Sequence, residues 1–440
     1  MADFIQQALE LSPRQAPQWL EPRHKSGRLS WQAKTVPSRK TEHWKYTNLR
    51  VLEQGCYLGE PQPIAIELEE NLREHFAIGE LDACVLVFVN GRFSATLSDA
   101  DVPHGVDLVP FSRASAAQVE QIGLHLGTVA KTDKHMFAAL NDSWLQEGVF
   151  VRVAANTRVE QPLHIVWLTT AQTNPFSVSQ RLLVIAESGS EATVLEHFAS
   201  DKSAQNSFTN GVTELVLEAN SRVHHYRLHL EEENALHIGG VHASLARDAV
   251  LNSFHLALGA KLKRIDVVIN HNGEGAHCDL NGVYLPRHSQ HVDYHTCIEH
   301  TVPRCTTNEN FRGIVADSAK AVFNGRIHIH PNAQKTLAQL SNKNLLTSDK
   351  AEVDTKPELE IYADDVQCAH GATVAQLDEQ AVYYLRSRGV SKKEADVMLS
   401  FGFINELVDK VSHQSVARYL RPLLAGLFAR EPQLARHIAP

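Results

Sequence analysis

The sequence predicts a mainly β protein: a parallel β-helix core flanked by N-terminal and C-terminal helical regions. Three observations support this fold class. Residues 148–376 contain short, alternating apolar strands that are separated by small polar turns, with no helical pattern between them. Similar strand positions recur at nearly constant intervals, since Val194, Val223, Val250 and His277 stand 29, 27 and 27 residues apart. Apolar residues at helical spacing occur only before and after this stretch.

The strand region is expected to form the β-helix core. Its clearest strands are Phe150–Val153, His164–Leu168, Leu182–Ile185 and Thr213–Leu217. A repeat of this length is typical of a solenoid, in which each coil completes the core of its neighbour. A large β-sandwich is the alternative, but its turn signals recur about every 8–12 residues without a longer period. Because a solenoid needs a cover at each end, the two flanking regions are candidate covers.

Residues 1–147 are expected to form a mostly helical region with a small β-hairpin. The hairpin is predicted by Asn90-Gly91, which stands between two apolar runs. Residues 113–146 then show apolar side chains at intervals of three and four, which indicates helix.

Residues 377–440 are expected to form a C-terminal helical region. Asp378 can cap a helix that Gly389 ends, and Ser391 with Glu394 forms a capping box at the start of the next helix. The helices that follow are apolar enough to serve as an end cap, as a surface for a partner, or as both.

Composition excludes several classes of protein. Acidic residues number 51 and basic residues 42, so the net charge is −9, which argues against nucleic acid as a partner. The longest apolar run, Cys84–Val89, is much shorter than the roughly 20 residues of a membrane span. The N-terminus carries no secretory signal, so we expect a cytoplasmic protein with reduced thiols and no membrane partner.

The sequence contains none of the common enzyme motifs. It does contain two clusters of potential metal ligands. The first spans His288–His300, with Cys305 close behind. On a strand, four of its residues alternate and share one face: His291, Asp293, His295 and Cys297. Such a strand spreads them over about 20 Å, too far to surround one ion without help. A ladder of hydrogen-bonded polar side chains is therefore the alternative to a metal site.

The second cluster is the pair Cys368 and His370, near the end of the strand region. Two positions apart on a strand, their side chains project to the same side, about 6.5–7 Å apart at Cα. A thiolate and an imidazole can hold iron, whereas the alternative is a buried cysteine beside a hydrogen-bonded histidine. Iron in a cluster requires four ligands, so a functional pair would need further ligands from another chain or from solvent.

Several motifs resemble the SufB/SufD family of iron–sulfur cluster assembly scaffold proteins. The most specific is DVQCAHGAT at 365–373, followed by YYLRSRG at 383–389. The other matching segments occur in the same order along the chain and cover 37–49, 311–314, 322–326, 333–336, 344–346 and 356–361. The resemblance as a whole extends from about residue 37 to about residue 430.

Within the family, the sequence is similar to the SufD branch. The SufB branch carries a His-Glu pair where this chain has Cys368 to His370. The SufB branch also has a reactive cysteine in the stretch that corresponds to 345–361, and no cysteine occurs here between residues 305 and 368.

The resemblance implies a right-handed parallel β-helix that assembles with a SufB-like subunit and two copies of a SufC-like ATPase. It implies a non-catalytic scaffold in which Cys368 and His370 are candidate metal ligands for a transient iron–sulfur cluster at the SufB interface. It also implies that residues 377–440 contact the ATPase and that reduced flavin associates with the complex. A homodimer through the strand edge is the alternative when partners are absent. Two other functions stay open: a metal-dependent β-helix enzyme that uses His288–His300, and a purely structural spacer.

Overall fold

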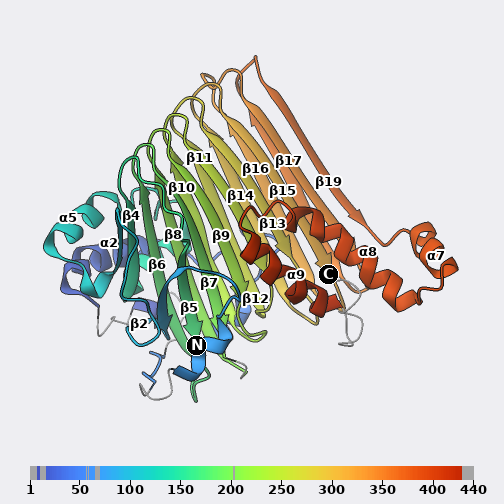
Figure 1. Ribbon diagram of the computed structural model, residues 1–440, viewed down its shortest axis with the longest axis horizontal. Coiled ribbons are helices and arrows are strands. Elements are labelled where there is room, and N and C mark those ends of the chain that lie inside the picture. Colours follow the sequence, from blue (N-terminus) through green and yellow to red (C-terminus); the bar gives the residue numbers. More distant parts are fainter. Residues whose placement is uncertain are drawn as a thin grey trace.

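The chain folds into a parallel β-helix with two sheets, and from β4 (Glu147–Val153) onward successive strands alternate between them (Figure 1). In the part of the chain that the structure describes, one sheet has ten strands and the other has nine. The structure is a computed structural model that describes residues 7–9, 16–55, 57, 59–64, 70–201 and 204–428.

The ten-stranded sheet contains one antiparallel strand at its N-terminal edge, and its other neighbouring strands are parallel. In spatial order it consists of β19 (Gln367–Ala375), β17 (Leu337–Leu346), β15 (Thr306–Val315), β13 (His277–Tyr284), β11 (Val250–Ala257), β9 (Arg222–Leu230), β7 (Glu191–Ser200), β5 (Leu163–Thr169), β1 (Cys84–Val89) and β2 (Arg92–Ser94).

The nine-stranded sheet faces it and begins with one antiparallel strand, β3. In spatial order it consists of β18 (Glu352–Ile361), β16 (Lys320–Ile329), β14 (His291–His300), β12 (Leu262–His271), β10 (Leu236–Leu245), β8 (Ser207–Leu217), β6 (Phe176–Ala186), β4 (Glu147–Val153) and β3 (Val106–Pro110).

The interior between the sheets is built from rows of side chains that stack from coil to coil. Alternate residues of each strand face inward, so register partners on neighbouring coils occupy the same row. One such row contains Val223, Leu251 and Cys278, all fully buried. Because each coil buries the inner side chains of the next, the repeat produces one continuous apolar core.

The N-terminal region covers the outer face of the nine-stranded sheet. Trp31, Phe137 and Trp144 pack there against strands β8, β10 and β12. Asp142 of α6 also forms a buried 2.6 Å ion pair with Arg181 of β6. The described helices and 3₁₀ turns of this region are η1 (Gln18–Leu20), α2 (Glu21–Gln32), η2 (Glu42–Trp44), α3 (Arg50–Gln54), η3 (Glu70–His75), η4 (Phe111–Arg113), α5 (Ala116–His125) and α6 (Met136–Trp144).

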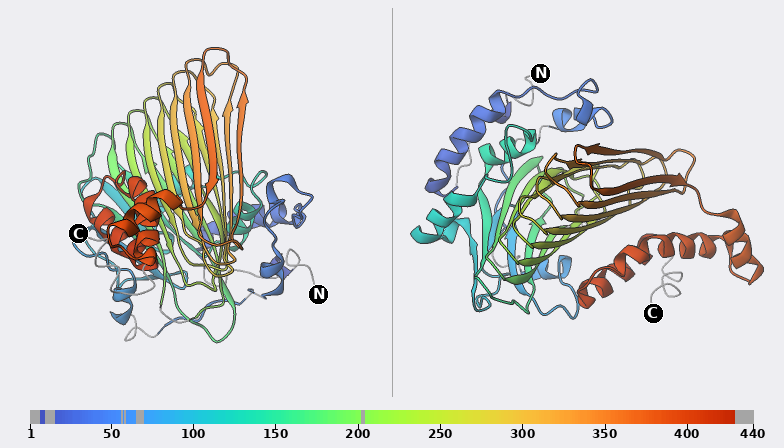
Figure 2. Two further views of the ribbon diagram at one scale, coloured as in Figure 1. Left: turned by 90° about the vertical axis from the view of Figure 1, so that its right-hand side faces the viewer. Right: turned by 90° about the horizontal axis from the view of Figure 1, so that it is seen from above.

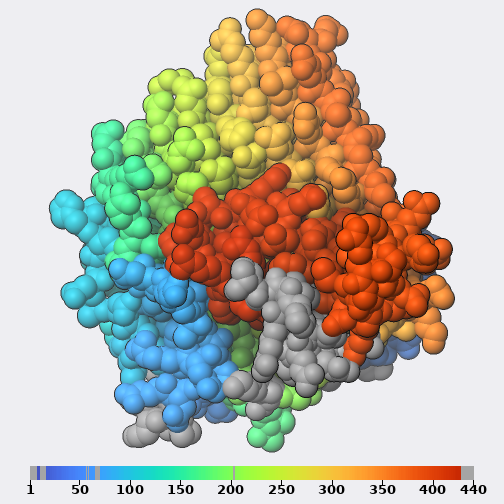
Figure 3. All heavy atoms as spheres, turned by 45° about the vertical axis from the view of Figure 1, so that its right-hand side comes forward, coloured from blue at the N-terminus to red at the C-terminus, as the bar shows by residue number. Residues whose placement is uncertain are grey.

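The C-terminal helices cover the opposite face of the molecule. Helices α8 (Lys392–Val408) and α9 (Gln414–Phe428) lie along the outer face of the ten-stranded sheet (Figures 2 and 3). They therefore pack beside the coils and do not cap the last one. Helix α7 (Glu379–Ser387) has no buried residue and projects beyond the sheets.

The structure confirms the predicted fold class and several local signals. Asn90 and Gly91 both have positive φ, at 50° and 77°, and join β1 to β2 in the predicted hairpin. The side chain of Asp378 accepts a hydrogen bond from the amide of Gln380, and Ser391 opens α8 with the predicted capping box. The division of the chain at residues 147 and 376 stays a prediction.

The predicted repeat positions were only partly right. Val250 and His277 are register partners, but Val194 pairs with His225 and not with Val223. The reason is that the coils differ in length: the register step from Val194 to His225 is 31 residues, whereas the step from Val250 to His277 is 27. Among the described residues, no helix combines the length and apolar character needed to cross a membrane.

Candidate functional site

Cys368 and His370 lie on the last strand of the ten-stranded sheet, at the uncovered end of the β-helix. Their register partners on the previous coil, Ala338 and Leu340, are fully buried core residues. The two side chains therefore continue inward-facing rows, as their spacing predicted. No further coil follows within the described residues, so His370 is exposed and Cys368 is half-buried against the edge of the core.

Both sheets end here with a free backbone edge. Strands β18 and β19 are the last strands of their sheets, and no residue of β18 or β19 is buried. The amide of Gln367 donates to the carbonyl oxygen of Thr336, the residue that directly precedes β17. Because backbone groups alternate in direction along a strand, the amides of Cys368, His370 and Ala372 point away from β17. Such an edge is a template for a strand of another chain.

The thiol of Cys368 is not activated in the isolated chain. Burial raises its pKa above the ordinary range, against a smaller opposing effect of a backbone hydrogen bond from Ala338. A metal ion or a partner's positive charge would have to displace the thiol proton. Among the described residues, neither Cys368 nor His370 belongs to a group of three potential metal ligands.

The face of β14 that carries His291, Asp293 and His295 forms a hydrogen-bonded ladder. Thr47 bonds to the imidazole of His291 at 2.9 Å and donates to the carboxylate of Asp293. Arg264 donates to Asp293 at 2.8 Å and contacts His295 at 3.2 Å. These contacts connect the side chains to one another and to the protein without an ion, which favours the structural interpretation.

Cys297 continues the same face, where it lines a cavity of about 830 Å³ together with His295 and residues of the N-terminal region. Arg326 donates to its sulfur at 3.2 Å, and burial together with the Glu299 carboxylate raises the pKa of the thiol to about 11. Among the described residues, no three of the side chains His291, Asp293, His295 and Cys297 form a group of potential metal ligands. The geometry therefore gives no support to a catalytic metal centre there.

Three other groups of potential ligands are present in the described chain. None was predicted as a group, although His300 and Cys305 belong to the first predicted cluster. The three groups are His271, His300 and Cys305; His229, Glu231 and His237; and Glu299, His328 and His330. The 29-residue interval from His271 to His300 equals one coil of the repeat, so it could have predicted that these two histidines lie side by side. Of the other two groups, one combines residues around a single turn and the other combines residues of two neighbouring coils. Without the exact register of the coils, the sequence does not show that these residues lie close together.

Two of these groups already hold a protein cation. Lys263 donates to the Glu231 carboxylate at 2.7 Å, deep inside the β-helix. Burial opposes ionisation of Glu231, but Lys263 and His237 hold the pKa of that carboxyl well below its usual range. On the outer face, the guanidinium of Arg326 donates to Glu299 at 3.1 Å.

The fold and this end define a class of protein: a two-sheet parallel β-helix, covered on both faces by helical regions, whose last coil is left open. The chain belongs to the SufBD family. Residues 168–403 match the domain described as "SUF system FeS cluster assembly, SufBD core domain", and residues 2–165 match the SufBD protein N-terminal region.

Similar proteins agree with this assignment. The chain is 33% identical over 403 residues to the iron–sulfur cluster assembly protein SufD of Escherichia coli, covering 91% of this chain and 90% of the relative. It is 32% identical over 395 residues to an iron–sulfur cluster assembly SufBD family protein of Synechocystis, covering 88% and 86%. A SufD from Bacillus subtilis is 27% identical over 421 residues, covering 92% and 93%.

Proposed function

We propose that this chain is a cytoplasmic, non-catalytic scaffold subunit for iron–sulfur cluster assembly. Cys368 and His370 would supply two ligands to a nascent cluster, and a SufB-like subunit would supply the others. Membership of the SufBD family supports the assembly role. The main support for the site is the position of Cys368 and His370. Both lie on the inward face of an uncovered strand, beside a free backbone edge.

The incomplete ligand set is the chemical reason for a shared site. An iron–sulfur cluster is held mainly by thiolates, with histidine as a known substitute, and it needs about four ligands. Two donors on one strand leave the cluster half held, which suits a scaffold that must release its product. Edge pairing to a second chain would bring further donors to the same place, whether that chain is the SufB-like subunit or a second copy of this one.

Helix α7 is the proposed contact for the SufC-like ATPase. Tyr383 and Tyr384 are 74% and 56% exposed on it. Exposed aromatic side chains are typical of protein interfaces. ATP hydrolysis in that partner would move the two β-helices relative to each other and open or close the shared site. Reduced flavin is implied only by the family resemblance, and we assign no flavin site among the described residues.

The test is to replace His370 with Ala in the complex with SufB-like and SufC-like partners, followed by anaerobic reconstitution with Fe²⁺ and sulfide. We expect normal complex formation with loss of most bound iron and sulfide, and a similar loss for Cys368→Ser. Gln367→Ala is the matched control, because Gln367 lies on the same strand and faces away from the inner row. A His370→Ala complex that assembles and keeps a full cluster would contradict the proposal.

A further inference from the structure

A pair of histidines interrupts an aliphatic row inside the β-helix. His271 and His300 are register partners at the ends of β12 and β14, and both are fully buried. Their neighbours in the same row are Leu245 on one side and Ile329 on the other. Leucine or isoleucine would therefore satisfy the packing at both positions, so the two imidazoles require another explanation.

The hydrogen bonds of the pair leave one nitrogen of each ring unsatisfied. The hydroxyl of Thr307 lies 3.0 Å from Nε2 of His271 and 3.1 Å from Nε2 of His300. Neither Nδ1 has a hydrogen-bond partner among the described residues. A hydroxyl has one proton, so it can donate to one Nε2 and must accept from the other. The first ring then buries an unpaired Nδ1–H and the second an unpaired Nδ1 lone pair, and each unpaired buried group destabilises the fold.

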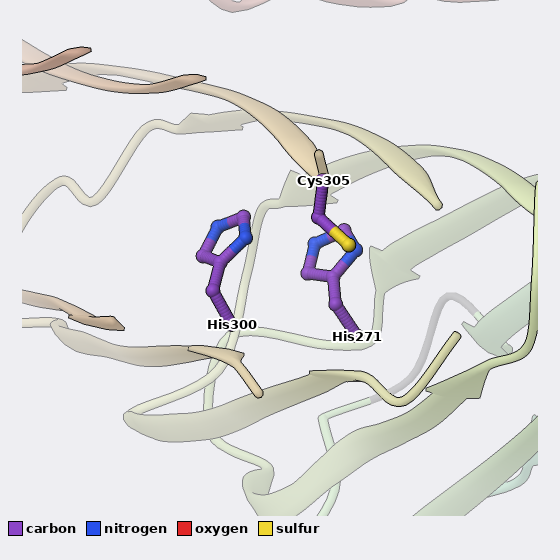
Figure 4. A group of neighbouring side chains, drawn as sticks. All are labelled: His271, His300 and Cys305. Carbon is purple, nitrogen blue, oxygen red and sulfur yellow. The ribbon is translucent and has the colours of Figure 1, made fainter. Parts of the chain in front are cut away.

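Cys305 brings a third donor to the same place. It directly precedes β15 and is fully buried, and its side chain points toward His271 with His300 beside it (Figure 4). One potential ligand atom from each of the three residues lies within 4.8 Å of the other two. The thiol makes only long contacts of 3.4 Å and 3.5 Å to backbone carbonyl oxygens.

We propose that His271, His300 and Cys305 form an internal binding site for one divalent transition-metal ion, Zn²⁺ or Fe²⁺. The ion would bind Nδ1 of both imidazoles and the sulfur of Cys305. Both Nε2 atoms then carry protons and donate to Thr307, whose oxygen has two lone pairs to accept them. Metal binding therefore satisfies every ring nitrogen at once, and the thiol proton leaves to solvent. This site is separate from Cys368 and His370.

The required movement is small. Bonds of about 2.0–2.3 Å in tetrahedral geometry place ligand atoms roughly 3.3–3.8 Å apart. The imidazole rings are now stacked, with centroids 4.4 Å apart and planes 11° apart. Closing on an ion requires a shift of about 1 Å and a tilt of the rings, which rotation about the side-chain bonds can supply. Burial lowers the pKa of both histidines, that of His300 to about 4, so the rings are neutral as ligands must be.

The other two groups of potential ligands are weaker candidates. The Glu231 group holds the ammonium of Lys263, and the Glu299 group holds the guanidinium of Arg326. In both cases a protein cation occupies the place of the ion. Of these three groups, only the one with Cys305 offers a thiol and no competing charge.

The experiment uses the full chain, stripped of metal with a chelator and then titrated separately with Zn²⁺ and, anaerobically, with Fe²⁺. We expect about one tightly bound ion per chain by elemental analysis. Titration with Co²⁺ should produce a thiolate-to-metal charge-transfer absorption band. The ion retained by protein purified directly from cells identifies which of the two metals the site selects.

Matched variants locate the ion. His300→Leu and Cys305→Ala introduce side chains that already occur in the same rows, Leu245 beside His271 and Ala276 beside Cys305, so both variants are expected to fold. Each should lose the bound ion and the Co²⁺ band, whereas His370→Ala and Cys278→Ala should keep both. Retention of one ion by folded His300→Leu or Cys305→Ala would overturn the proposal. So would a wild-type chain that binds no ion, since a buried water would then satisfy the two Nδ1 atoms.

Discussion

The carboxyl group of Glu309 is buried in the same inward row that ends at His370. Its register partners are Leu280 and Leu340, and neither of its oxygens has a hydrogen-bond partner among the described residues. Burial raises the pKa of this carboxyl from an ordinary 4.5 to about 7. Burial favours the neutral, protonated form of such a carboxyl group, so the stability of the protein depends on pH.

We expect Glu309→Gln to stabilise the protein at alkaline pH and to have little effect near pH 4.5. At pH values below 4.5 the group is protonated in both the folded and the unfolded state. Between pH 4.5 and about 7 the unfolded chain releases the proton while the folded chain keeps it, so stability falls as pH rises. The difference between variant and wild type should reach about 3 kcal/mol above pH 7. Denaturant unfolding at several pH values measures it, and parallel curves for the two proteins would contradict it.

Single residues differ in how far the sequence could predict their roles. Cys368 and His370 stand two apart on one strand, so their shared face followed from strand geometry alone. His271, His300 and Cys305 meet only because two coils stack in a particular register. The sequence gives the period of the repeat approximately, and an error of one residue moves a side chain to the other face.

At the scale of elements, helix α9 is held to the outer face of the ten-stranded sheet by apolar contacts. Leu420 and Leu424 are fully buried in the same cluster as Leu228 and Leu256 of the sheet. Tyr226 of β9 also shares a hydrogen bond of 2.7 Å with Ser412, just before the helix. These contacts fix the direction of the whole C-terminal region.

We therefore expect Leu420→Ala to lower the free energy of unfolding by about 2–5 kcal/mol, because it leaves a cavity between helix and sheet. Limited proteolysis should cut α9 faster in the variant than in wild type. Gln414→Ala is the control on the exposed side of the same helix, with a change of about 0.5 kcal/mol or less. Equal stability of Leu420→Ala and wild type would show that α9 does not depend on this contact.

Local signals predicted the elements better than their packing. The hairpin at Asn90-Gly91 and the caps at Asp378 and Ser391 depend on a few neighbouring residues, and all three are confirmed. The placement of α8 and α9 beside the coils depends on an apolar sheet face formed by residues from about 195 to 345. Such a surface exists only after the coils have stacked. From the sequence alone, an end cap and a surface for a partner were therefore equal alternatives for the role of the C-terminal helices.

For the whole molecule, asymmetry between the two ends is the main feature. The first coils are covered by the N-terminal region, while β18 and β19 are left without any buried residue. A repeat protein normally protects its terminal coil, since an open strand edge invites pairing with another chain. An uncovered end that carries a thiol and an imidazole is expected to be covered by a partner in the assembled state.

We expect Ala372→Pro to weaken association through this edge without unfolding the chain. The amide of Ala372 points away from β17, so proline removes no hydrogen bond within the sheet but blocks a bond to an added strand. Light scattering and pull-down should show binding to a SufB-like subunit, or self-association, weakened about tenfold or more, which corresponds to at least about 1.4 kcal/mol. Ala372→Ser keeps the amide and serves as the control. If the folded proline variant associates as tightly as wild type, the partner must bind elsewhere, and the two donors on β19 would face solvent in the complex as well.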